Sequence, residues 1–185
     1  MLATIVSIAA VTATVATALF VWKQAGLLRI QNQLQALIQL NSAWDSTRMR
    51  FLRSSWAEDE LRDRLTDDDR DLDTLEPLLE FLEEFASLRR QKILDDELVW
   101  DSTIGWHAAR YYFYNFDNNN VGRLRSNWMD GTLYQNLEIL WQGYLKIEAN
   151  ERGIDEKELI KQIRETKPNF LKAERNVHRI PENSD

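Results

Sequence analysis

The first 22 residues, Met1 to Trp22, contain no charged side chain. As a helix rising about 1.5 Å per residue, this segment would measure roughly 33 Å, enough to cross a hydrocarbon core about 30 Å thick. Trp22 is followed by Lys23, and an aromatic ring next to a cation is typical of the membrane–water boundary. The segment therefore predicts a transmembrane helix, with the lipid bilayer as a partner of residues 1–22.

Two other interpretations of this segment are open. A secretory signal peptide has a basic start and an apolar core of about 7–15 residues. Here no Lys or Arg precedes the core, although Ala16-Thr17-Ala18 could serve as a cleavage site. A buried helix of a globular domain would be shorter and would show a polar face. We expect the membrane helix.

Basic residues lie on the C-terminal side of the predicted helix, whereas only the amino terminus is basic on the other side. The positive-inside rule then predicts a protein of the inner (plasma) membrane that crosses it once, with its C-terminal body in the cytoplasm. The basic residues concerned are Lys23, Arg29, Arg48, Arg50 and Arg53.

Few helix breakers and many aromatic residues follow the predicted membrane segment. The whole chain has only six Gly and three Pro, but seven Trp, seven Phe and five Tyr. This composition predicts an all-α protein, in which the N-terminal transmembrane helix continues into a cytoplasmic helical bundle. The expected divisions are a membrane helix (1–22), a juxtamembrane helical stem (23–55), a helical domain (56–167) and an irregular tail (168–185).

The predicted domain is acidic. Residues 54–100 carry sixteen acidic and six basic side chains, a net charge of −10. Because phosphate binding requires Lys and Arg gathered on one face, this charge excludes nucleic acid as an expected partner.

The stem shows a coiled-coil-like spacing of three and four residues that runs from Leu27 to Trp44. Such a stripe fits either a partner helix or packing against the protein's own domain. Trp44 and Arg48 are four residues apart, so on a continuous helix the guanidinium would lie over the indole. The positions of the stripe are Leu27, Ile30, Leu34, Leu37, Asn41 and Trp44.

Further helices are expected along the domain. Residues 76–91 have one wide apolar face that includes Phe81 and Phe85. We also expect a helix from Asp95 to Phe116, a turn over residues 117–122, a long helix from Leu133 to about Gly153, and a short polar helix over residues 155–167.

Residues 78–107 resemble part of an uncharacterised bacterial family of single-pass, membrane-anchored helical proteins. The shared features are a Trp-then-Arg helix (Trp44, Arg48), a Leu-Leu-x-Phe-Leu-Glu-Glu-like helix (residues 78–84), an Asp-x-Glu-Leu-Val helix (residues 95–99) and an aromatic helix with Trp106. The resemblance implies an all-α, membrane-anchored protein and supplies no activity.

No catalytic, cofactor-binding or metal-binding residues are predicted. The chain has no Cys and only His107 and His178, and we expect His107 to be a hydrogen-bonded core or boundary residue. A calcium loop starting at Asp69 would require Gly at its sixth position, where Thr74 stands. The acidic residues 80, 83 and 84 are expected to form the solvent-exposed face of their helix. We therefore predict that the protein is not an enzyme and needs no cofactor.

The prediction is a protein-interaction or scaffold module, acting through a protein partner or self-association. The alternative is a small-ligand or metal sensor with a pocket lined by Trp100, Trp106, Tyr111 and Glu83, because aromatic walls with a few polar groups are typical of ligand pockets. The candidate interaction surface comprises Leu27, Ile30, Leu34, Leu37, Trp44, Arg48, Phe81 and Phe85.

Overall fold

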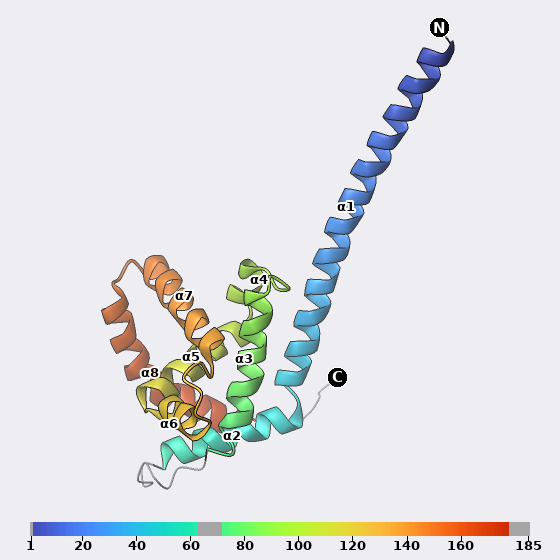
Figure 1. Ribbon diagram of the computed structural model, residues 1–185. Coiled ribbons are helices and arrows are strands. Elements are labelled where there is room, and N and C mark those ends of the chain that lie inside the picture. The colour runs from blue at the N-terminus through green and yellow to red at the C-terminus, as the bar shows by residue number, and fades with distance from the viewer. Residues whose placement is uncertain (1, 63–71, 178–185) are drawn as a thin grey trace. The chain divides into compact units, whose positions relative to one another are not determined.

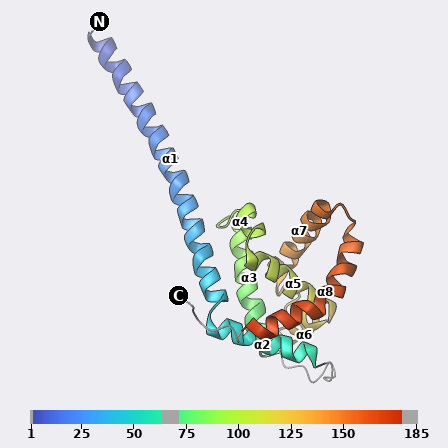
Figure 2. The same ribbon diagram turned by 180° about the vertical axis from the view of Figure 1, so that it is seen from behind.

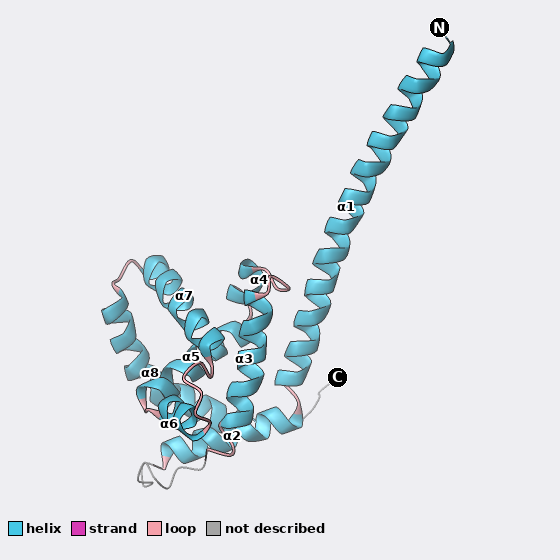
Figure 3. Cartoon of the chain, viewed as in Figure 1, coloured by secondary structure: helices cyan, strands magenta, loops and turns pink. Residues whose placement is uncertain are grey.

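The computed structural model describes residues 2–62 and 72–177, without the side chains of residues 2–13 and 15. Within these ranges the chain forms eight α-helices and no strand (Figure 3), which confirms the all-α prediction. The helices are α1 (Leu2–Trp44), α2 (Thr47–Leu61), α3 (Glu76–Arg90), α4 (Asp96–Trp100), α5 (Thr103–Asp117), α6 (Asn120–Asn127), α7 (Gln135–Arg152) and α8 (Glu156–Asn176).

The chain divides into two compact units, Met1–Gln39 and Leu40–Asp185. Helix α1 supplies the whole described part of the first unit, and its last residues belong to the second. The second half of the predicted stem, residues 40–55, therefore belongs to the folded helical unit.

The predicted membrane helix falls mainly on residues 1–13 and 15, which lie outside the described side chains. Among the described residues, no helix has both the length and the apolar character that a membrane crossing requires. The start of the rejected calcium loop, at Asp69, and the end of the predicted tail, residues 178–185, also lie outside the described part of the chain.

The second unit is a bundle built around α5. Helix α2 packs against α8, while α7 contacts α3, α5 and α8 (Figures 1 and 2). The predicted apolar face of α3 is confirmed, since Leu78, Leu82 and Phe85 are fully buried. From α5 the core receives an aromatic run that includes Tyr111, Tyr112 and Tyr114.

Two expected helices are interrupted by serine caps. Helix α1 ends at Trp44, and the Ser46 side chain accepts a hydrogen bond from the Met49 backbone N–H at the start of α2. Likewise, the expected helix from Asp95 to Phe116 divides into α4 and α5, because the Ser102 hydroxyl accepts from the Gly105 N–H. A serine side chain satisfies a free N–H at a helix start and so favours a new helix there.

The prediction of an irregular tail from residue 168 is wrong for its described part. Helix α8 continues through Pro168 to Asn176. Proline inside a helix removes a backbone hydrogen bond, but Phe170, Leu171 and Glu174 are buried on the far side of it. Their burial holds the last turns of the helix against the bundle.

Candidate functional site

The residues of the predicted interaction surface separate into two groups. Leu27, Ile30 and Leu34 are 60%, 53% and 44% exposed, and Arg48 is also exposed. Leu37 and Phe81 are partly covered.

Trp44 and Phe85 instead belong to the core of the second unit, at 2% and 0% exposure. They cannot contribute to an exposed surface, so that part of the prediction is wrong. Its physical reason is that both residues lie on helix faces that turn toward the bundle.

Trp44 is packed among aromatic rings rather than against Arg48. Its ring stacks on Phe81 at 5.7 Å between centroids and meets the edge of Tyr111 at 5.9 Å. The guanidinium over the indole is that of Arg53, 4.2 Å from the ring centroid. The predicted Trp44–Arg48 stacking fails because the helix breaks between the two residues.

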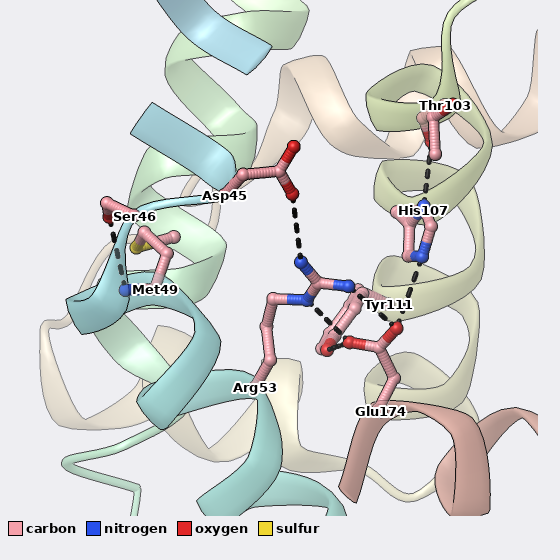
Figure 4. Close-up of polar contacts among 8 residues, drawn as sticks. All are labelled: Asp45, Ser46, Met49, Arg53, Thr103, His107, Tyr111 and Glu174. Carbon is pink, nitrogen blue, oxygen red and sulfur yellow. Dashed lines mark hydrogen bonds and ion pairs between the residues drawn. The ribbon is translucent and has the colours of Figure 1, made fainter. Parts of the chain in front are cut away.

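Arg53 also belongs to a buried charged cluster (Figure 4), with Glu174 on α8 and Tyr111 and His107 on α5. Arg53 donates from Nε and Nη2 to the two oxygens of Glu174, at 2.6 and 3.0 Å. The Tyr111 hydroxyl donates to Glu174 Oε2 at 2.6 Å. Arg53 and Glu174 are only 4% and 3% exposed, so the cluster joins three helices inside the bundle.

His107 completes the cluster and is hydrogen-bonded, as predicted. Its Nδ1 lies 2.8 Å from the Thr103 carbonyl oxygen, and its Nε2 lies 3.2 Å from Glu174 Oε1. A carbonyl oxygen and a carboxylate can only accept, so both contacts are satisfied when both ring nitrogens carry hydrogen.

Glu174 is held ionised by its neighbours. Burial alone would raise its pKa, but hydrogen bonds and positive charge from His107 and Arg53 outweigh that effect and lower the pKa to about 2. The pKa of Tyr111 is shifted upward instead, because burial and the negative charge of Glu174 raise it well above the usual value of a tyrosine. The cluster thus consists of an ionised carboxylate surrounded by donors.

The chemistry of this cluster is structural. Four grooves of the described residues are lined by other side chains than those of the cluster. Its effect is to fix α2 and α8 against α5, and to hold the indole of Trp44 beneath the Arg53 guanidinium.

The structure brings together only half of the predicted ligand pocket. Trp100 and Trp106 line one groove of about 480 Å³, together with Tyr144. Tyr111 is fully buried in the charged cluster. Glu83 lies on α3 and bonds to the start of α7, so neither Tyr111 nor Glu83 contributes to the groove.

Glu83 also departs from the expected solvent-exposed face of α3, whereas Glu80 and Glu84 are exposed as predicted. The Glu83 carboxylate accepts from the backbone N–H groups of Asn136 and Leu137, at 3.0 and 2.9 Å. These groups belong to the first turn of α7, whose own N-cap position, Tyr134, makes no side-chain cap. A carboxylate at a helix start is favoured by the helix dipole, and here it comes from another helix.

Comparisons with protein-family models, with curated proteins and with solved structures found no match. The resemblance to a membrane-anchored bacterial family therefore stays a prediction. Within the described ranges, no group of three or more His, Cys, Asp or Glu residues is arranged to hold a metal ion.

Sequence reasoning missed the Arg53–Glu174 pair, although a signal was present. Arg53 lies four residues after Met49 and three before Trp56, so it shares their buried face of α2. Glu174 likewise follows Phe170 and Leu171 at helical spacing. A charged residue at a position that the helix buries requires a partner of opposite charge inside the protein.

Proposed function

We propose that this chain is a membrane-anchored, non-enzymatic protein-interaction module, whose stem binds a helix of a protein partner or of a second copy. The observation that carries the proposal is the concentration of exposed apolar side chains on α1. Five large ones lie on the stem itself, between Leu27 and Ile38. An apolar surface of this kind is typical of an interaction site.

The arrangement of these side chains favours a helical partner. Leu27, Ile30, Leu34 and Leu37 alternate at spacings of three and four, which supplies the a and d positions of a two-helix coiled coil. Continuing the register puts Asn41 at an a position, where asparagine favours one register and one oligomeric state. Two anchors in the same membrane would bring two such stems together in parallel.

The anchor itself rests on the uncharged sequence of residues 1–22 and on the basic residues that follow it. Arg53 is paired with Glu174 inside the bundle, so it does not count toward the positive flank. Lys23, Arg29, Arg48 and Arg50 remain, and they support an inner-membrane protein with a cytoplasmic body.

The test is cross-linking of the full-length protein in membranes, followed by purification and identification of the adducts. We expect adducts for the natural chain and their loss when Leu27, Ile30 and Leu34 are changed together to Ser. The matched control changes Gln31 and Gln35 to Ser on the same exposed stretch. Equal adducts in both variants would overturn the stem as the interaction site.

The anchor has its own test. The full-length chain should sediment with membranes and resist alkaline carbonate washing, because an inserted helix is held by the hydrophobic effect rather than by charge. Removal of residues 1–22 should release it. Release of the full-length chain by carbonate would overturn the membrane part of the proposal.

A further inference from the structure

The groove between Trp100 and Trp106 lies where three helices of the second unit meet. Its lining comes from the end of α4, the start of α5 and the last two turns of α7. Its volume of about 480 Å³ falls within the range of ordinary small-molecule sites, roughly 300–1,000 Å³. The proposed protein-binding function makes no use of it.

Three aromatic side chains line this groove. Trp100 and Tyr144 meet edge to face with centroids 4.6 Å apart. The Trp106 ring instead packs against His107 and Phe170, with the Arg110 guanidinium 5.3 Å from its centroid, so Trp100 and Tyr144 are the rings left for a ligand. The faces of Trp and Tyr rings carry negative charge density that attracts cations.

The Trp100 side of the groove is rigidly held. The Arg89 guanidinium lies 4.6 Å from the Trp100 ring centroid and is fixed by a 2.8 Å hydrogen bond to Asp96. The Tyr144 hydroxyl donates to the Trp100 carbonyl oxygen at 2.8 Å. Gly143 leaves the space that the indole occupies, because a Cβ there would lie only 2.7 Å from the ring. A binding wall fixed in advance costs little to order when a ligand arrives.

Carboxylates complete the lining. Glu148 is paired with Arg110 and Arg152. Asp101 and Glu151 are exposed, and in the described part of the chain no hydrogen bond or ion pair engages either side chain. Burial raises the pKa of the Tyr144 hydroxyl, and the charges of Glu148, Asp101 and Glu151 raise it further. Arg152 also lines the groove but is paired with Glu148, so Asp101 and Glu151 are the carboxylates left to balance a cation beside Trp100 and Tyr144.

We propose that this groove binds a small organic cation of the quaternary ammonium class. Such a cation is large, weakly hydrated and apolar at its surface, so it can contact aromatic faces while carboxylates balance its charge. A metal ion is a poorer match, because no three metal-ligating side chains converge among the described residues. The proposal adds a ligand site to a protein whose predicted role is protein binding.

The test is titration of the purified full-length protein with choline, followed by tryptophan fluorescence and calorimetry. A maltoside detergent avoids any ammonium headgroup, and sodium chloride at equal concentration controls for ionic strength. We expect saturable binding, and Asp101→Asn and Glu151→Gln should each raise the Kd by about three- to fivefold. Glu84→Gln, on the exposed face of α3, is the matched control and should leave the Kd unchanged.

The neutral isostere 3,3-dimethylbutanol has nearly the shape of choline without its charge. Equal binding of this alcohol, equal binding by the Asp101→Asn and Glu84→Gln variants, or no saturable response to either free choline or phosphatidylcholine vesicles would overturn the proposal. The ammonium could belong to a free solute or to a lipid headgroup. Saturation by free choline assigns a solute, whereas a response confined to phosphatidylcholine vesicles, and absent with phosphatidylglycerol, assigns a headgroup.

Discussion

The Arg53 guanidinium and the Glu174 carboxylate are joined by two hydrogen bonds, of 2.6 and 3.0 Å, across 121 residues of sequence. The pair links α2 to the end of α8, and both side chains are almost completely buried. Removing one partner of a buried ion pair leaves the other charge desolvated and unpaired, which is far more costly than losing an exposed pair.

Glu174→Gln should therefore lower the free energy of unfolding by about 3–5 kcal/mol. Chemical denaturation followed by tryptophan fluorescence measures it. The matched control is Asp117→Asn, which breaks a bidentate pair with Arg164 of similar geometry. That pair is 57% and 34% exposed, so its loss should cost no more than about 1 kcal/mol. Equal effects would contradict the structural role of the buried pair.

Stability should also fall in acid because of the same residue. The pKa of Glu174 is lowered from 4.5 to about 2 in the folded protein, so the folded state holds this proton less tightly than the unfolded state. Its contribution is therefore fully present above the unfolded value and is lost as the pH falls from about 4.5 toward 2. Unfolding measured across this window should show a steeper acid loss for the natural chain than for Glu174→Gln. Parallel curves would contradict the assignment.

The cap that α3 supplies to α7 gives a second stability prediction. Glu83→Ala removes the acceptor of two backbone N–H groups in the first turn of α7, and should cost about 1–2 kcal/mol. The neighbouring Glu84→Ala removes an exposed carboxylate and should change stability by no more than about 0.5 kcal/mol. Thermal unfolding of the two variants compares them directly, and an equal loss for both would exclude the cap.

Gly143→Ala tests how Trp100 is positioned. A methyl group there would meet the indole at 2.7 Å. Alanine favours the helix by about 1 kcal/mol, but overpacking costs about 1–3 kcal/mol. We expect a displaced Trp100, seen as changed tryptophan fluorescence, with no gain in stability. Gly131→Ala has open space around its new Cβ and should leave the spectrum unchanged. A stabilised variant with the natural spectrum would contradict the close packing.

The all-α fold was predictable because composition and apolar periodicity act locally. The buried face of α3 follows from the spacing of its leucines and phenylalanines. The end of α8 was not predictable from local rules, since Pro168 disfavours a helix and only the packing of Phe170 and Leu171 restores it. Local propensity is a weak guide where tertiary packing decides.

The candidate site was only partly predictable for the same reason. Trp100 and Trp106 were expected to share a pocket, and they do. Tyr144 on α7 also lines the groove, although it lies more than thirty residues after Trp106 in the chain. No local sequence pattern predicts a contact over this separation. The sequence predicted an exposed Glu83 carboxylate, because its partners are two backbone N–H groups of α7. Backbone groups from a distant segment produce no pattern in the sequence around Glu83.

A cysteine scan tests most directly whether the stem forms a helical interface. The natural chain has no cysteine, so single cysteines placed in turn at residues 26–36 of the full-length protein form disulfides in membranes without background. Cross-linking should peak at Leu27, Ile30 and Leu34 and be weak at Gln31 and Gln35, with the 3.5-residue period of a coiled coil. For a partner other than a second copy, a cysteine-reactive photo-cross-linker on the same residues should give the same period. Uniform or absent cross-linking with both reagents would contradict the account.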